Sequence, residues 1–168
     1  GGPAPLEDQA LNRFLQQMVS QITGVPGSLV RPRWQPEPPN QPEIDVTWVA
    51  IGVADMRGDT FAAELHASDG ASSTIYRQED IDVLMSFYGP SAGAAFSALR
   101  EGLSLEQNRS YLTAAGFGLI GMPDGRAAPA LLNDRWQYRI DATLQLRRGV
   151  ARKYPILNVL SLDETIKT

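Results

Sequence analysis

The chain has 168 residues, of which 43% are hydrophobic, with a net charge of −4 and no cysteine. This length and this apolar content predict a single domain over residues 1–168 with its own core, and the lack of cysteine excludes disulfides and zinc–thiolate sites. No apolar run approaches the ~20 residues that a membrane-spanning helix needs, so we expect no membrane partner.

The first predicted element is an amphipathic helix over residues 6–22, where apolar residues recur at helical spacing. Gly24 and Pro26 follow it and are typical of a helix end. Next comes LVRPRWQPEPPNQPE, residues 29–43, with five prolines. Each proline disfavours helical backbone at the residue before it, so this segment is predicted to be an extended arm without regular structure.

Strands and a helix pair are predicted after the arm. A strand covers residues 48–53, a turn 56–59, a second apolar piece 60–66 and a loop 68–73. In the following strand the apolar and polar residues alternate up to a Gly-Pro stop, and the apolar side carries Ile81, Val83, Met85 and Phe87. Two short helices are then predicted, at 91–102 and 104–116.

The C-terminal third contains the clearest alternation in the chain. After a strand at 116–122 and an irregular segment to residue 133, apolar and polar residues alternate over 136–146. The face predicted to be buried carries Trp136, Tyr138, Ile140, Ala142, Leu144 and Leu146. A last short strand is expected at 155–160. Because the order shows no βαβ repetition, we predict an α+β fold, a mostly antiparallel sheet with the N-terminal helix and the central helix pair packed on one face.

Residues for catalysis or for metal binding are scarce. His66 is the single histidine, and there is no G-x-S-x-G and no phosphate-binding glycine loop. Asp80 and Asp82 lie two apart on one strand face, where they are consistent with a divalent-ion site, with acid–base chemistry or with a solvated polar face. We favour the polar face. The sequence therefore predicts no enzyme activity, no catalytic residue, no metal site and no cofactor.

Two basic clusters remain. One comprises Arg31 and Arg33 beside Trp34, and the other lies within residues 147–154. The second cluster consists of Arg147, Arg148, Arg152, Lys153 and Tyr154. Such clusters are typical of nucleic-acid binding and also of protein interfaces. Because the whole chain is acidic, with a pI near 5.0, we favour protein interfaces.

Five segments together resemble the neck or tail-terminator proteins of tailed bacteriophages. They are SLVRPRWQPEPPNQP, WVAIGV, DVLMSFYGP, GLSLEQNR and LQLRRGVARKYPILNVL. The resemblance covers about residues 6–161, and the C-terminal SLDETIKT, residues 161–168, fits no pattern and is expected to be a flexible tail.

The resemblance implies a structural virion protein without cofactor. It would form a ring, in such a family six-fold, at the phage neck, assembled in the cytoplasm of the host bacterium. The ring would close the tail tube and join it to the head–tail connector or stopper protein. DNA would pass through the ring without specific binding.

Roles for the two clusters follow from a ring. The arm would dock on a neighbouring subunit, with Trp34 as a buried anchor and with Arg31 and Arg33 paired to carboxylates, or it would fold back over its own sheet. The cluster 147–154 would lie at one end of the sheet against a partner ring. The alternatives are a head-completion (stopper) or tail-tube protein, a nucleic-acid-binding accessory protein that uses the cluster 147–153, and a hydrolase that uses the two aspartates.

Overall fold

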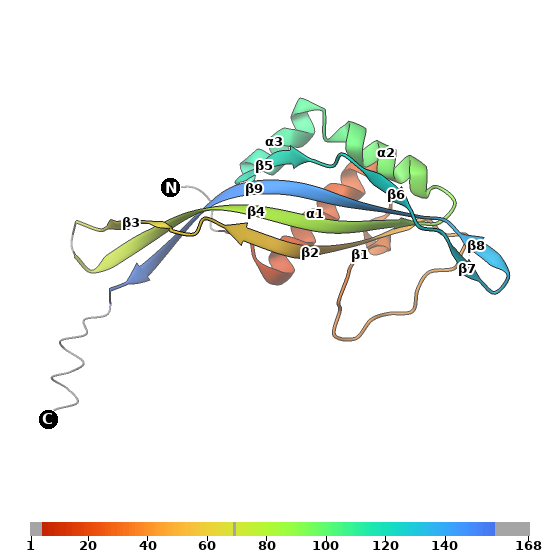
Figure 1. The fold of residues 1–168 in the computed structure, drawn as a ribbon, viewed down its shortest axis with the longest axis horizontal. Coiled ribbons are helices and arrows are strands. Elements are labelled where there is room, and N and C mark those ends of the chain that lie inside the picture. Colours follow the sequence, from red (N-terminus) through yellow and green to blue (C-terminus); the bar gives the residue numbers. More distant parts are fainter. Residues whose placement is uncertain (1–4, 69, 157–168) are drawn as a thin grey trace, which may run out of the picture.

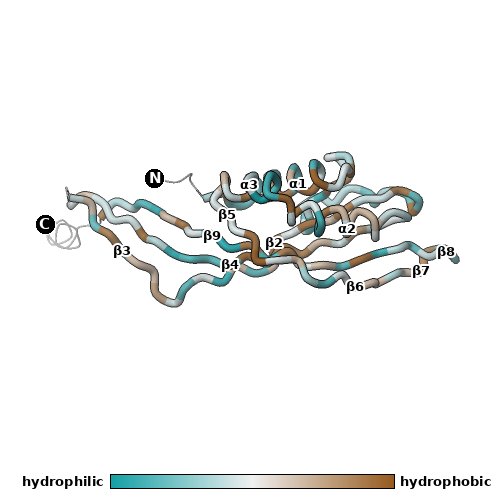
Figure 2. Tube along the Cα trace, turned by 90° about the horizontal axis from the view of Figure 1, so that it is seen from above, coloured by the Kyte–Doolittle hydropathy of each residue, from teal (hydrophilic) through white to brown (hydrophobic). Residues whose placement is uncertain are grey.

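A long twisted sheet carries the helices on one of its faces in the computed structural model, which describes residues 5–68 and 70–156 (Figures 1 and 2). The helices are α1 (Asp8–Thr23), α2 (Ala92–Gly102) and α3 (Glu106–Ala114), with one 3-10 turn, η1 (Gly27–Leu29). The strands of the sheet are β1 (Val30–Pro32), β2 (Trp48–Gly58), β3 (Ala63–His66), β4 (Ser72–Tyr88), β5 (Phe117–Gly121), β6 (Gly125–Ala127) and β9 (Arg139–Pro155). A separate two-stranded sheet consists of β7 (Ala130–Leu132) and β8 (Arg135–Gln137).

The main sheet has the strand order β1-β2-β4-β9-β5. Strand β3 pairs with β4 beyond the end of β2, and β6 pairs with β9. All pairs are antiparallel except β1 with β2. The predicted α+β class is therefore confirmed, with the N-terminal helix and the central helix pair in their predicted places.

The core lies between the sheet and the helices. The apolar side of β4, predicted from its alternation, is buried, with its four residues at most 1% exposed. The helix α1 packs Leu15 and Val19 into this core, and α2 packs Leu99. Every second residue of the strand and every third or fourth residue of the helices thus point into the same layer between sheet and helices.

Three strands are longer than predicted. Strand β2 runs through the predicted turn at 56–59, and β4 begins at Ser72, before the alternating stretch. Strand β9 continues through the basic cluster to Pro155. The predicted turn was wrong because β2 stays paired with β4 as far as Gly58 opposite Glu79. In the same way, unbroken pairing of β4 with β9, from Ser72 opposite Pro155 to Tyr88 opposite Arg139, holds their polar segments extended. In these segments the neighbouring strands supply the backbone hydrogen bonds, and the local pattern of apolar and polar residues does not indicate a strand.

The predicted strand 136–146 is interrupted, and its first two apolar residues are not buried. Trp136 belongs to β8 and Tyr138 to the link before β9, and both are exposed. The cause is a tight hairpin: Asn133 and Asp134 both adopt positive φ, which suits a two-residue turn between β7 and β8. The segment predicted to be irregular is thus largely a hairpin.

The structure also bears on the predictions for the proline-rich arm and for the C-terminal end. Residues 30–32 of the arm form β1, a strand where none was expected, because β2 offers an open edge. The predicted short strand at 155–160 falls mostly outside the described residues, and the predicted tail 161–168 lies wholly outside them.

Candidate functional site

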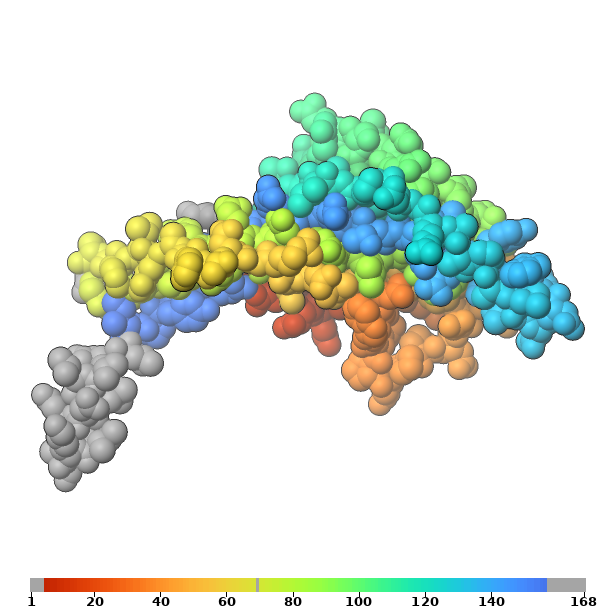
Figure 3. Space-filling model, viewed as in Figure 1, coloured from red at the N-terminus to blue at the C-terminus, as the bar shows by residue number. Residues whose placement is uncertain are grey.

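The beginning of the proline-rich arm is held on its own subunit. Strand β1 pairs with β2 from Val30 opposite Val49 to Pro32 opposite Ile51, and the Arg33 amide donates to the carbonyl of Ile51. On the other side, the Gln16 side chain of α1 donates to the carbonyl of Val30 at 2.7 Å. After residue 33 the chain leaves the sheet as a long projecting loop (Figures 1 and 3). The first residues of the arm therefore cover the edge of the sheet, and the rest of the arm projects from the subunit.

Arg33 enters a polar chain on the sheet face opposite the helices. Its guanidinium donates to the Ser86 hydroxyl, and that hydroxyl donates to Asp141, both at 2.7 Å. Arg139 donates to the same carboxylate at 2.8 Å. Burial raises the pKa of Asp141, but the hydrogen bonds from Arg139 and Ser86 and the two nearby positive charges outweigh burial and hold the pKa below its usual value.

Arg31 is also engaged within the subunit. It donates to the backbone carbonyl of Asn40 at 2.8 Å, and its guanidinium lies 5.9 Å from the centre of the Trp48 ring. The Trp48 ring stacks on Tyr88 at 4.3 Å. Both arginines of the arm thus have partners inside the subunit, where the prediction had paired them with a neighbour's carboxylates.

Trp34, unlike the two arginines, is largely exposed to solvent. Its ring lies over Gly52 of β2, where a Cβ atom on the glycine would come within 2.6 Å of the ring. Its backbone has a positive φ of 54°, and 68% of the residue is exposed. The arm therefore presents one large aromatic residue on the outside of the subunit.

The second basic cluster does not form one patch, because it lies within β9 and its side chains alternate between two faces. Arg147 pairs with Asp80 at 2.8 Å, and Arg152 pairs with Glu7. Lys153 and Tyr154 are exposed. Only Lys153 and Tyr154 lie near the end of β9, and as successive residues of the strand they point to opposite faces of the sheet.

Arg148 is a structural residue of the subunit. It is 4% exposed, lies 3.0 Å from the Glu79 carboxylate and donates to the carbonyl of Leu6 at 2.6 Å. The Phe117 ring centre lies 5.3 Å from its guanidinium. A side chain so enclosed is not available to a partner ring. Arg148 therefore does not lie at the surface, where the prediction had placed it against a partner ring.

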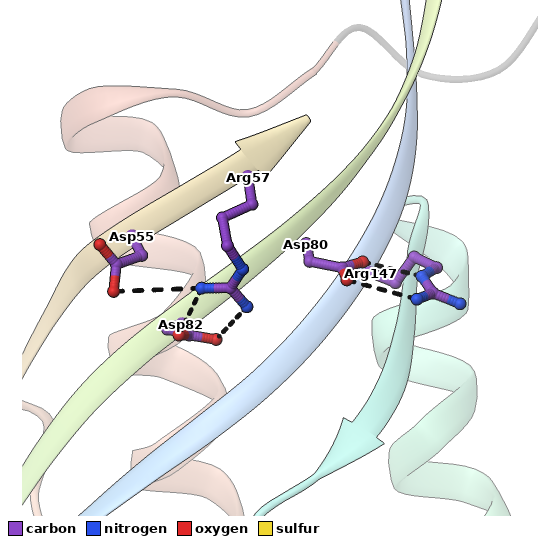
Figure 4. A network of polar contacts seen from close by, with 5 residues as sticks. All are labelled: Asp55, Arg57, Asp80, Asp82 and Arg147. Carbon is purple, nitrogen blue, oxygen red and sulfur yellow. Dashed lines mark hydrogen bonds and ion pairs between the residues drawn. The ribbon is translucent and has the colours of Figure 1, made fainter. Parts of the chain in front are cut away.

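The two aspartates of β4 are neutralised by arginines from the adjacent strands (Figure 4). Arg57 binds Asp82 through two hydrogen bonds of 2.6 and 3.0 Å, and Arg147 binds Asp80 at 2.8 and 3.3 Å. Hydrogen bonds from these arginines lower the pKa of both carboxyl groups. Among the described residues no group of three or more side chains could hold a metal ion. The ion-paired ladder corresponds to the polar face that we favoured for these residues.

One prominent surface was not predicted. The hairpin β7–β8 projects from one end of the molecule, and the β3–β4 end lies at the opposite end (Figure 3). Leu131, Trp136 and Tyr138 are exposed at the hairpin, and Leu65 and Tyr76 are exposed at the other end. The Asn-Asp turn is the signal that could have revealed the hairpin, because it places the two aromatic residues outside the main sheet. Within the part of the chain that the structure describes, no helix is long and apolar enough to cross a membrane.

A protein-family model described as phage neck terminator protein matches residues 9–168 of the chain. The match includes the C-terminal SLDETIKT, which the resemblance had left unassigned. No curated protein matches the chain.

Proposed function

Because the chain belongs to the family of phage neck terminator proteins, whose role is structural, we propose that it ends the phage tail as a ring of six copies. The ring closes the tail tube and joins it to the head–tail connector or stopper protein. It is assembled in the host cytoplasm and remains in the virion. The observation that carries this proposal is the family match over residues 9–168.

The shape of the subunit supports a ring. The hairpin end and the β3–β4 end differ in structure and lie at opposite ends of the long axis (Figure 1). A contact between two unlike surfaces repeats from copy to copy and closes into a ring when the rotation allows it.

The charge pattern supports passage of DNA without specific binding. On the sheet face opposite the helices, Arg57, Arg139 and Arg147 each pair with a carboxylate. Phosphate binding depends on unpaired cations, so a channel wall made of this face would let DNA slide. The same pairing disfavours a nucleic-acid-binding function for residues 147–153, in which Arg148 and Arg152 are also paired.

Electron microscopy of tails assembled with and without the protein tests the proposal. We expect tubes of uniform length, closed at the head-proximal end by a six-fold ring, only when the protein is present. A ring that binds filled heads instead of tails would overturn the terminator role in favour of a head-completion protein. Incorporation along the whole tube would favour a tail-tube protein.

A further inference from the structure

One end of the sheet extends beyond the helices as a ribbon of three strands (Figure 1). Strand β4 lies in its middle, β3 pairs with β4 on one side, and the last part of β9, residues 149–155, pairs with β4 on the other side. All residues of β3 and most of residues 149–155 are exposed. The ribbon therefore projects from the body of the subunit.

Both edges of this ribbon are open within the part of the chain that the structure describes. Strand β3 pairs with β4 alone, and on the far side of β9 the pairing with β5 ends at Arg148. Alternate residues of an edge strand direct their N–H and C=O groups away from the sheet, and natural proteins cover or pair such edges. An extended segment of another chain can add to an open edge through backbone hydrogen bonds. The ribbon thus offers two sites for strand addition.

The two open edges match in level and in direction. Ala63 of β3 and Ala151 of β9 both lie opposite Tyr76, so residues 63–66 and 151–154 are level with each other on the two sides of β4. Both strands are antiparallel to β4 and therefore run in the same direction. Rotation about a ring axis preserves level and direction. Strand β9 of one copy can therefore meet β3 of the next in a parallel pair, as β1 meets β2 within the subunit.

The two edges carry opposite charge. Residues 59–66 contain two carboxylates and no lysine or arginine, a net charge of −2, and the neighbouring Arg77, which donates to a carbonyl of this segment, brings it to −1. Residues 149–155 contain one arginine and one lysine, a net charge of +2, and the pairing of Arg152 with Glu7 brings it to +1. The signs thus remain opposite when these neighbours are counted. Surfaces that associate are complementary in charge in this way.

We propose that the open edge of β3 in one copy pairs with the open edge of β9, residues 149–155, in the next copy. Glu64 then lies beside Arg152 of the next copy, because both are level with Ile75 and point to the same face of the sheet. The contact joins unlike edges, so it repeats head to tail, and the sheets of successive copies continue into one another around the ring. It rests on the proposed ring and names the strands that build it.

Cysteine crosslinking tests the contact directly, because the chain has no cysteine of its own. Ala63→Cys and Ala151→Cys are prepared as separate proteins, since both positions are exposed and both lie opposite Tyr76. We expect a short bismaleimide to give dimers from the mixture of the two proteins and none from either alone. A mixture of Ala151→Cys with Leu105→Cys, which is exposed between α2 and α3, is the control and should give none. Dimers from Ala151→Cys alone would overturn the proposal, since they require β9 to pair with β9.

Hydrogen exchange of the wild-type protein distinguishes a second copy from another partner. The backbone amides of β3 and of residues 149–155 should exchange more slowly in rings than in the monomer. Protection of β3 that arises only after rings bind purified tails would assign this edge to the tail tube protein and overturn the proposal.

Electron microscopy of the wild-type protein, in solution and on tail ends, separates this proposal from the proposed function. Wild-type rings without crosslinks in the mixture overturn the edge pairing and leave the ring standing. Crosslinks without rings leave the edge pairing standing and overturn the ring. If neither rings nor crosslinks form, both are overturned.

Exchange of the two charges provides a second test. Glu64→Arg and Arg152→Glu should each lower the association constant between copies by about tenfold, because each places like charges side by side, and the double variant should regain most of the loss. The matched control is Glu101→Arg, which reverses an exposed carboxylate of α2 and should assemble like the wild type. Sedimentation measures the association. A double variant that assembles no better than the single variants would overturn the contact.

Discussion

Arg147 and Arg148 are neighbours in the sequence with opposite surroundings. Arg147 lies on the exposed face of β9, where its side chain is 60% exposed and pairs with Asp80. Arg148 points to the helix side, where Glu79, the carbonyl of Leu6 and the Phe117 ring enclose it. Two successive side chains of a strand point to opposite faces, so one residue of register decides whether the cation is buried.

The first prediction compares these two arginines. Arg148→Ala should lower the free energy of unfolding by about 3 kcal/mol or more, because it leaves the Glu79 carboxylate buried without its cation. Arg147→Ala should cost less than about 1 kcal/mol, since exposed ion pairs contribute little. Urea denaturation of both variants measures the difference. Equal effects would contradict the assignment of faces within β9.

The second prediction concerns pH and Asp141. Its pKa is lower in the folded protein than its ordinary value of 3.8, so the unfolded chain binds the proton more readily. The stabilisation by Asp141 is therefore complete above about pH 5 and is lost as the pH falls through the lowered pKa. Wild type and Asp141→Asn should differ most at neutral pH and converge towards pH 2 in urea titrations. A difference that grows on acidification would contradict the direction of the pKa shift.

At the scale of elements, the arm changes character along its length. Up to Arg33 it is part of the sheet, with backbone pairing to β2 and side-chain bonds to β4 and β9 through Ser86 and Asp141. Beyond Trp34, whose ring still lies over Gly52, the arm projects from the subunit as a loop (Figure 3). The same segment thus covers its own edge strand and exposes a large aromatic residue at the surface of the subunit.

The third prediction separates these two roles. Trp34→Ala should leave the melting temperature nearly unchanged, since most of the residue is exposed, and should weaken the ring. Gly52→Ala should weaken the ring similarly, because its methyl group would displace the Trp34 ring. Thermal melts and size analysis of both variants test this. A lowered melting temperature with normal rings would mean that Trp34 only covers its own sheet.

At the scale of the whole molecule, the long sheet separates surfaces that can serve different partners. The two apolar ends lie along the long axis, and the ion-paired ladder lies between them on one face (Figures 1 and 4). Lys153 and Tyr154 are exposed near the C-terminal end of β9. We infer that these two residues, without Arg148, face the partner ring.

The fourth prediction tests that surface. Lys153→Glu with Tyr154→Ala should leave the ring intact and impair its joining to the tail tube or connector, with an effect that added salt mimics in the wild type. Leu105→Asp serves as the control away from this surface, because Leu105 is also exposed, in the link between α2 and α3. Binding of rings to purified tails, viewed by electron microscopy, measures the loss. Normal joining together with lost DNA affinity would favour the nucleic-acid alternative.

Local patterns in the sequence determined the fold class, the N-terminal helix, the helix pair and the buried face of β4, because burial imposes a period of 3.6 on helices and of two on strands. The tertiary structure alone decided the lengths of β4 and β9, which depend on pairing between residues far apart in the chain. The exposure of Trp136 and Tyr138 has a local cause, because the Asn-Asp turn forms a hairpin that takes them out of the main sheet, but the alternation over 136–146 was interpreted as a single strand. The tertiary structure also divided the basic cluster between two faces and brought Arg33 to Ser86 and Asp141. Contacts of this kind join segments more than fifty residues apart, and no local spacing encodes them.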